Sequence, residues 1–298
     1  MTDDSWKRFT GLLAAVLVAV GCGGGEEGGA AGGGEPEAAA EAAAPIVDPA
    51  TAATVRGTVS FEGTPPAAQP IDMAEEPSCV EAYGPEGPRT QEVVVNDGRL
   101  ANVFVYVKEG LSQEFPAPSE AATLDQVACR YHPHVLGVQV GQPLAILNSD
   151  DLLHNINAKP AVNRGFNISQ PRAGMESTRE FRAPEVMIPV QCDVHGWMQA
   201  YVGVLPHPYF AVAGADGTFE IPNLPPGEYV IEAWHETYGT QTQNVSVGAS
   251  ETAEVSFTYS ADMARGAVVP LGEPLIVRHE EAGAHLAGGS RSDAGVTP

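Results

Sequence analysis

Basic residues are scarce in this chain, which has 15 Lys and Arg against 38 Asp and Glu among its 298 residues. The resulting net charge of −23 at pH 7 surrounds the protein with a strongly negative field. Such a field repels the phosphates of nucleic acids and the headgroups of anionic lipids. Nucleic acid is therefore not an expected partner, and neither is direct binding to an anionic membrane surface.

Several motifs of enzymes are missing as well. The sequence has no Ser-His-Asp order of a catalytic triad, no Gly-rich loop for phosphates and no evident motif of paired carboxylates. We therefore expect that the protein is not an enzyme.

Sustained helical periodicity is also lacking, while 33 Gly and 25 Pro favour turns between short strands. Residues 93–95 and 103–107 predict a hairpin around the turn at Asp97 and Gly98. Strands are predicted at residues 55–61, 93–95, 103–107, 135–140, 144–147, 186–190 and 201–205. The fold class is therefore expected to be all-β, built of β-sandwiches.

The apolar run at the N-terminus, residues 12–20, is too short to be a stable membrane span. Lys7 and Arg8 precede it and small residues follow, which is typical of a secretory signal. The end of this segment resembles a bacterial lipobox, so we interpret residues 1–22 as a lipoprotein signal peptide with Cys22 acylated. Ordinary signal cleavage is the alternative.

Low-complexity sequence follows the signal and returns at the C-terminus. The Gly/Ala/Glu composition of residues 23–51 is typical of a flexible tether, and residues 262–298 are expected to form a flexible tail. Together with Cys22, this organisation predicts a location in the cell envelope. The protein would be lipid-anchored, on the periplasmic side or on the outer-membrane or extracellular face.

The motif that carries chemistry is Cys192-x2-His195-x2-Met198, with His154 lying 38 residues before Cys192. A thiolate, two imidazoles and a weak thioether are the ligands of a blue-copper centre. Zinc also accepts Cys and His, but it gains little from Met. The alternatives without a metal are that His154 is a polar residue at a strand end and that Met198 belongs to the core.

The remaining cysteines are expected to pair, because thiols outside the cytosol are oxidised unless they are acylated or bound to metal. With Cys22 on lipid and Cys192 on copper, Cys79 and Cys129 are left to form a disulfide. Pairing of Cys192 with Cys79 or with Cys129 stays open from the sequence, although either bridge consumes the proposed ligand.

Residues 124–206 resemble a cupredoxin, on the evidence of the segment from Asn148 to Asn155 and of the compact Cys-x2-His-x2-Met loop. The resemblance implies a Greek-key β-sandwich that holds one type 1 copper ion. In that family the Asn after the first His ties the two ligand loops together, which gives Asn155 a supporting role.

A second module resembles the transthyretin-like sandwich of carboxypeptidase regulatory domains. Residues 216–221 read D-G-x-F-x-I, and residues 224–229 read L-P-P-G-x-Y, with strong turns at both places. We assign residues 52–206 to a cupredoxin-like domain with an N-terminal extension and residues 207–261 to the regulatory-like sandwich. Strands at 56–59 and 101–105 leave open the alternative that the cupredoxin is inserted into that sandwich.

Two further groups of polar residues have alternative interpretations. His132 and His134 lie two apart on an expected strand and could form a second metal site, although exposed His is common. Trp234-His235-Glu236 could form a docking patch, but a Trp that fills the sandwich is the preferred interpretation.

These features predict a blue-copper protein that transfers one electron in the cell envelope. The expected partner is a c-type cytochrome or an exported oxidoreductase, and the membrane is reached through the N-terminal lipid. Two alternatives stay open. One is a protein that stores, delivers or senses copper, and the other is a surface protein with a vestigial site whose sandwich binds a partner or glycan.

Overall fold

A computed structural model describes residues 47–84 and 87–266 of this chain. The expectations for the signal peptide, for acylation of Cys22 and for most of the tether lie outside these residues. Residues 262–266 of the predicted tail belong instead to a 3-10 helix, η2 (Ala261–Gly266), whose Ala264 packs against the apolar core, and the rest of the predicted tail, residues 267–298, lies outside the described residues. Within the described residues, no helix is long and apolar enough to cross a membrane.

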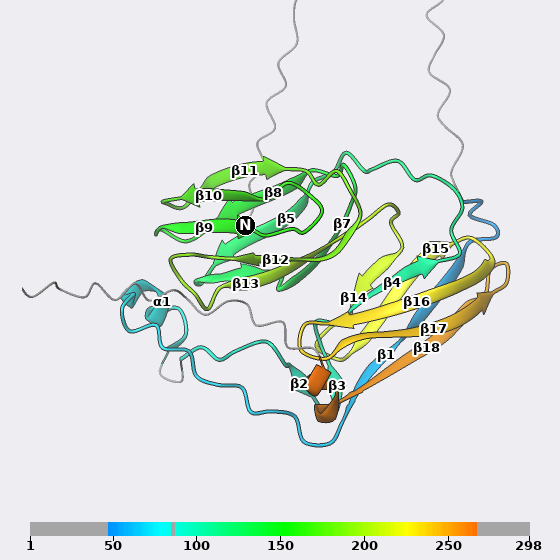
Figure 1. Ribbon diagram of the computed structural model, residues 1–298, viewed down its shortest axis with the longest axis horizontal. Helices are drawn as coiled ribbons and strands as arrows, with labels where there is room; N and C mark the ends of the chain where they lie inside the picture. The colour runs from blue at the N-terminus through cyan, green and yellow to red at the C-terminus, as the bar shows by residue number, and fades with distance from the viewer. Residues whose placement is uncertain (1–46, 85–86, 267–298) are drawn as a thin grey trace, which may run out of the picture. The chain divides into compact units, whose positions relative to one another are not determined.

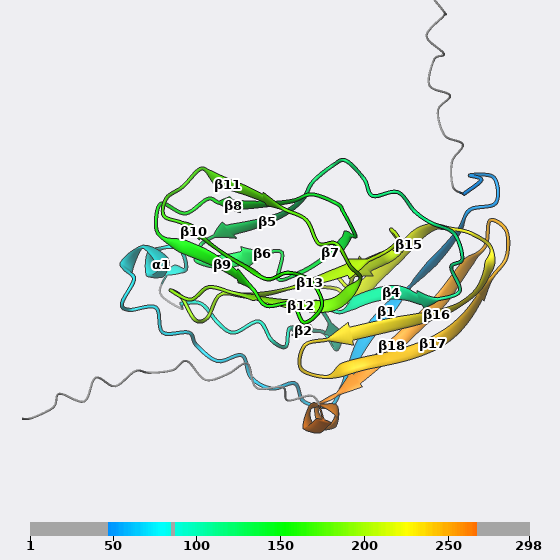
Figure 2. The ribbon, with the colours of Figure 1, turned by 45° about the horizontal axis from the view of Figure 1, so that its top comes forward.

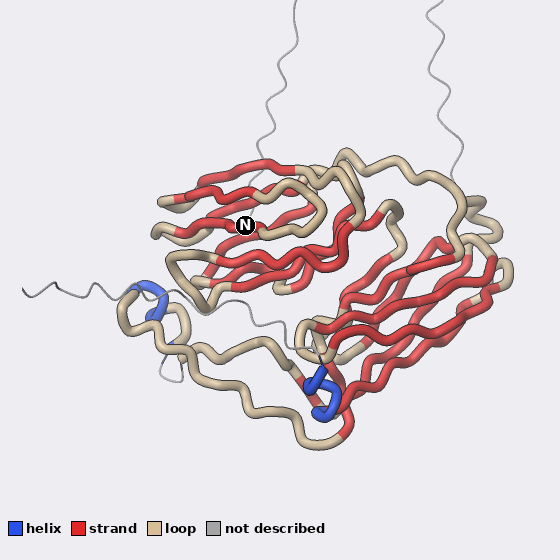
Figure 3. Tube along the Cα trace, viewed as in Figure 1, coloured by secondary structure: helices blue, strands red, loops and turns tan. Residues whose placement is uncertain are grey.

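Two β-sandwiches make up the described chain, and strands dominate both (Figure 3). The expectation of an all-β fold is confirmed. The first, here called the outer sandwich, consists of β1 (Ala53–Glu62), β2 (Val95–Asn96), β3 (Arg99–Leu100), β4 (Phe104–Glu109), β14 (Phe210–Val212), β15 (Thr218–Leu224), β16 (Gly227–His235), β17 (Gly239–Val247) and β18 (Thr252–Ser260). One of its sheets has the order β15-β1-β3-β2 with β18 also paired to β1, and the other has the order β14-β4-β16-β17.

The second, here called the inserted sandwich, carries the candidate ligands (green in Figure 1). Its strands are β5 (Ala122–Val127), β6 (Arg130–His132), β7 (Val135–Gln139), β8 (Leu144–Asn148), β9 (His154–Ala158), β10 (Phe166–Gln170), β11 (Met175–Arg179), β12 (Glu185–Gln191) and β13 (Gln199–Leu205). The sheets have the orders β10-β9-β12-β13-β7 and β11-β8-β5-β6, and their apolar faces enclose one core.

Strand pairing corrects the expected boundary between residues 206 and 207. β1, assigned by sequence to the cupredoxin-like domain, pairs in parallel with β18 from Thr54–Thr252 to Glu62–Ser260. β4 pairs with β14 and β16, so it too belongs to the outer sandwich. The pairing therefore follows the insertion alternative: β5–β13 leave after β4 and return before β14, both labelled in Figure 1, and Figure 2 shows the same strands turned by 45°. The sequence left the two arrangements open because strand partners about 200 residues apart leave no local signal.

The expected hairpin of residues 93–95 and 103–107 is only half right. Asp97 and Gly98 do form the turn, both with positive φ, but β2 pairs with β3 instead of β4. Asn102, also at positive φ, donates its backbone N–H to the Ala213 carbonyl oxygen at 3.0 Å, and the chain passes to the other sheet.

The long connection between β1 and β2, here called the excursion, packs on the inserted sandwich. Its short helix α1 (Pro77–Glu81) buries Cys79, and Met73 lies in the same core as the inserted strands. Part of the expected N-terminal extension of the cupredoxin-like domain is therefore present, between two strands of the outer sandwich.

Two glycines make room for the contact between the sandwiches. Gly137 of β7 and Gly203 of β13 lie directly opposite each other in a parallel pair. A Cβ on Gly203 would lie 2.7 Å from the Phe104 ring, and one on Gly137 would lie 2.3 Å from the Phe210 ring. The absence of both side chains leaves a notch in the sheet, and aromatic rings of β4 and β14 fill it.

Trp234 does not fill the outer sandwich, which corrects the preferred interpretation. Alternation along β16 turns Ile231, Ala233 and His235 into the core, where His235 stacks on Tyr238 with ring centroids 4.9 Å apart. Trp234 faces the inserted sandwich, and its ring centroid lies 5.1 Å from that of Tyr201.

Candidate metal centre

Two segments of the inserted sandwich bring the candidate ligands together. His154 is the first residue of β9, while Cys192, His195 and Met198 lie in the loop from β12 to β13. Backbone hydrogen bonds close this loop, from the Cys192 N–H to the Met198 carbonyl at 3.1 Å and from the Met198 N–H to the His195 carbonyl at 2.9 Å. All three residues therefore lie in one short, closed loop at the end of the sandwich.

The side-chain donors of His154, Cys192 and His195 converge. Nδ1 of His154 lies 2.9 Å from Nδ1 of His195, and Cys192 Sγ lies 4.0 Å from the latter atom. All three donor atoms lie within 4.8 Å of one another, and none of the residues is more than 4% exposed. The two facing imidazole nitrogens can share one hydrogen, and together with the thiol they form a group that could hold a metal ion.

Cys192 is poised to be a thiolate. Burial raises the pKa of this thiol. Hydrogen bonds with the His154 and His195 side chains and with the Asn155 and His195 backbone have a larger, opposite effect, so the pKa falls below its usual value, to about 6. The thiolate is the form of cysteine that binds metal. Within the described residues, Cys192 is the free cysteine.

Met198 is fully buried in the same core as Cys192. Its backbone forms the closing hydrogen bonds of the loop, with the Cys192 N–H and with the His195 carbonyl. A thioether in that place is a weak axial ligand for copper.

Asn155 joins the two ligand segments. Its Oδ1 accepts the Asp193 N–H at 2.8 Å, and its Nδ2 donates to the Asp193 carboxylate at 3.0 Å and to Asn167 at 2.8 Å. This is the tie between the loops that the resemblance implies for Asn155.

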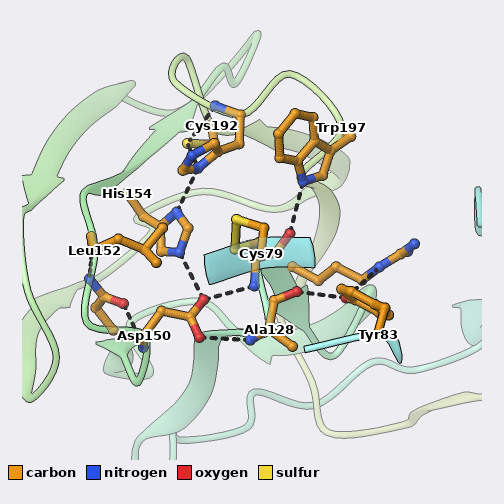
Figure 4. The surroundings of a disulfide bond; sticks show 12 residues. Cys79, Tyr83, Ala128, Asp150, Leu152, His154, Cys192 and Trp197 are labelled. Atoms are coloured by element: carbon orange, nitrogen blue, oxygen red, sulfur yellow. Dashed lines mark hydrogen bonds and ion pairs between the residues drawn. A yellow bond between two sulfur atoms is a disulfide. The ribbon is translucent and has the colours of Figure 1, made fainter. Parts of the chain in front are cut away.

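Asp150 is a site residue that the sequence analysis missed. Its Oδ2 lies 2.8 Å from Nε2 of His154, on the opposite side of the ring from the converging Nδ1 (Figure 4). Burial raises the pKa of Asp150, but hydrogen bonds from His154, Cys129 and Ala128 hold it below its usual value. A carboxylate on the far nitrogen fixes the tautomer and orientation of a ligand histidine. The spacing of four residues between Asp150 and His154 was the available signal.

The disulfide joins Cys79 to Cys129, the pairing expected from the sequence. Cys129 also lies in a cluster with Asp150 and His154, but its sulfur is bonded to Cys79 and supplies no thiolate. The rival pairings with Cys192 do not occur in the structure.

His132 and His134, which left open a second metal site, do not form a cluster. His132 ends β6 and is exposed, whereas His134 lies after that strand. Nε2 of His134 contacts Glu236 Oε1 at 2.5 Å, and its Nδ1 contacts the Gln199 carbonyl at 3.1 Å. Among the described residues, neither grouping of potential metal ligands contains these two histidines.

Residues 199–260 match the family model of the carboxypeptidase regulatory-like domain. The expectation of such a module in this part of the chain is confirmed, and it coincides with β14–β18 of the outer sandwich together with β13. No curated protein matches the chain closely enough to count as a relative.

Solved structures similar to this chain are cupredoxins and a larger copper protein. A purple cupredoxin from Nitrosopumilus maritimus is 22% identical with a TM-score of 0.25, over 28% of this chain and 98% of that one. An amicyanin variant in the Cu(I) state is 17% identical with a TM-score of 0.26, over 34% and 97%. The copper-containing nitrite reductase of Thermus scotoductus SA-01 is 18% identical with a TM-score of 0.25, over 31% of this chain and only 25% of that chain.

Proposed function

We propose that this protein binds one type 1 copper ion and transfers single electrons in the cell envelope. The observation that carries the proposal is the convergence of His154 Nδ1, His195 Nδ1 and Cys192 Sγ within 4.8 Å of one another, all three side chains being buried in the inserted sandwich. Cys192 would supply the thiolate, the histidines the equatorial imidazoles and Met198 the axial thioether. The bound ion would supply the redox chemistry.

Copper fits these residues better than zinc does. Structural zinc sites are closed by four Cys or His ligands, whereas this group offers three such donors and a buried thioether. Soft sulfur ligands suit copper.

Burial and hydrogen bonding favour electron transfer over storage or delivery of the ion. Asn155 ties the two ligand segments together, and Asp150 holds the far side of His154. Donors held in this way move little between oxidation states, which suits a centre that exchanges electrons. A protein that hands its ion to a partner needs an accessible donor, and His195 is only 4% exposed. No substrate chemistry is part of the proposal.

Absorption spectroscopy of copper-loaded protein tests the ligand set. We expect an intense visible band from the thiolate–Cu(II) bond in the wild type and its loss in Cys192→Ser, because a hydroxyl does not replace the soft donor. Ser169→Ala, in the neighbouring strand β10, serves as a control that should keep the band. An unchanged spectrum and copper content in Cys192→Ser would refute the assignment, and a wild type without the band would favour the vestigial-site alternative.

We further propose a c-type cytochrome or an exported oxidoreductase as the partner, with the lipid on Cys22 holding the protein at the membrane. Val194 and Leu153, each next to a ligand in the chain, are 50% and 42% exposed. They support an apolar docking contact, with charge acting mainly in steering. Transfer rates to a basic cytochrome should fall only weakly with salt, and a steep fall would show that charge dominates. Loss of fatty-acid labelling in Cys22→Ala tests the lipid.

A further inference from the structure

The turn between β5 and β6 is closed by two residues that ordinarily avoid its conformation. Ala128 and Cys129 have φ of 53° and 55°, the left-handed region that such hairpin turns require and that Asn and Gly usually supply. Other side chains cost free energy in this region and keep it only where their surroundings enforce it. The contacts of this turn therefore identify what holds it.

Those contacts come from both ligand segments of the metal centre. The Asp150 carboxylate accepts the Ala128 N–H and the Cys129 N–H, each at 2.8 Å. From the other side, Trp197 Nε1 donates to the Cys129 carbonyl at 3.1 Å (Figure 4). Asp150 precedes His154 by four residues, and Trp197 lies between His195 and Met198.

Each of these partners also contacts a candidate ligand. Besides the two turn amides, the Asp150 carboxylate contacts His154 Nε2 through Oδ2 at 2.8 Å. The Trp197 ring lies against the His195 ring, with centroids 5.1 Å apart. The disulfide from Cys129 to Cys79 fixes the turn to the helix α1 of the excursion, and the Tyr83 hydroxyl donates to the Ala128 carbonyl at 2.6 Å. One turn is thus linked to both histidines through a single residue each.

We propose that Asp150 and the disulfide-closed turn at Ala128 and Cys129 form one positioning unit, which orients His154 and His195 and sets the reduction potential of the centre. The inference rests on the proposed copper site. A carboxylate that accepts the Nε2 proton strengthens Nδ1 as a donor, and its charge favours the more positive oxidation state of the ion. The disulfide acts through Asp150, because it holds the two amides that the carboxylate accepts.

Asp150→Asn tests the carboxylate, with Asp151→Asn as a matched control that removes the same charge from the next, exposed position. We expect Asp150→Asn to lower the affinity for Cu(II) relative to Cu(I) about tenfold, which raises the potential by about 59 mV for one electron. Asp150→Glu, which keeps a carboxylate, should have a potential between those of Asp150→Asn and the wild type. Equal potentials in Asp150→Asn and Asp151→Asn would overturn the proposal.

A double-mutant cycle tests whether the disulfide acts through Asp150. The paired variant Cys79→Ser with Cys129→Ser should shift the potential in the same direction, and combining it with Asp150→Asn should add little. Fully additive shifts would show that the disulfide does not act through the carboxylate. Ala128→Gly relaxes the turn while keeping its amides, so it should leave the potential near that of the wild type.

Copper-free protein gives a second measurement that does not depend on the ion or on the serine variants folding. The His154 Nε2 proton should exchange slowly with water, and at least about tenfold faster in Asp150→Asn or after the folded protein is treated with a phosphine that reduces the disulfide. Unchanged exchange in both cases would refute the positioning unit. If the His154 proton is protected but the copper-loaded wild type shows no visible thiolate band, the proposed function is refuted instead.

Discussion

Asn155 and Asp193 exchange two hydrogen bonds beside the candidate metal centre, one from the Asp193 backbone to the Asn155 side chain and one in return to the Asp193 carboxylate. The exchange ties the start of β9 to the residue after Cys192. The candidate ligands His154 and Cys192, which come from two separate segments, are therefore fixed relative to each other by the protein itself.

Asn155→Ala should loosen this tie. We expect the affinity for copper to fall about 10- to 100-fold, the usual cost of losing a residue that supports metal ligands. Competition with a chelator of known affinity measures the loss. Asn157→Ala is the matched control, because Asn157 also donates to Asp193 at 2.9 Å but does not receive its N–H. Similar losses in both variants would contradict a specific role of Asn155.

Met198→Leu should keep the visible thiolate band and raise the reduction potential. The thioether is a weak donor that favours Cu(II), and leucine fills the same buried space without donating. Voltammetry together with the absorption spectrum checks this expectation. A potential equal to that of the wild type would show that Met198 belongs only to the core.

His235 should make the outer sandwich sensitive to acid. Burial, with a smaller contribution from His134, lowers the pKa of this imidazole to about 3. Between pH 6.5 and pH 3, His235 of the unfolded chain binds a proton that His235 of the folded chain does not. The contribution of the neutral, buried imidazole to the free energy of unfolding is therefore complete above pH 6.5 and decreases as the pH falls. By pH 4 the loss is about 3 kcal/mol of unfolding free energy.

Denaturant unfolding of copper-free protein at pH 7 and pH 4 measures this effect. His235→Asn, which has no titratable group, should lose about 3 kcal/mol less than the wild type over the same interval. Equal losses in the two proteins would show that His235 is not the group responsible.

Gly203→Ala should destabilise the contact between the sandwiches. The added Cβ would lie 2.7 Å from the Phe104 ring and 2.8 Å from Met187 Sδ. Overpacking of this kind costs about 1 to 3 kcal/mol, measured by denaturant unfolding. Gly196→Ala is the control for stability, since its Cβ would meet nothing within 4 Å. A Gly203→Ala protein as stable as the control would contradict the notch as a packing requirement.

Local sequence predicted the local features of this structure well. The strands predicted at residues 135–140, 144–147, 186–190 and 201–205, the turn at Asp97 and Gly98, and the spacing of Cys192, His195 and Met198 all depend on neighbours in the chain, although β9, β10 and β11 were not predicted. The disulfide followed from the chemistry expected of each cysteine, and Asn155 followed from the resemblance to cupredoxins.

Long-range relationships were harder to predict. Alternation identified β1 as a strand but could not choose a partner about 200 residues away. The apolar pattern did not show that Trp234 faces Tyr201 while His235 enters the core. Both faces of β16 are covered, and alternation alone does not tell which face meets which neighbour. Asp150 was missed because a carboxylate before a histidine is common, and only the folded turn shows its three contacts.

The insertion of β5–β13 between β4 and β14 has a consequence for the order of folding. Tyr106 pairs with Phe210, so the outer sandwich must close a loop of about 100 residues, at a chain-entropy cost of about 4 kcal/mol if the loop is unstructured. Once β5–β13 have folded, the ends of the loop already lie together, and the remaining closure is short. We expect the inserted segment to act as an internal template for the sheet that surrounds it, so that slow or failed folding of the interior segment also delays assembly of the exterior one.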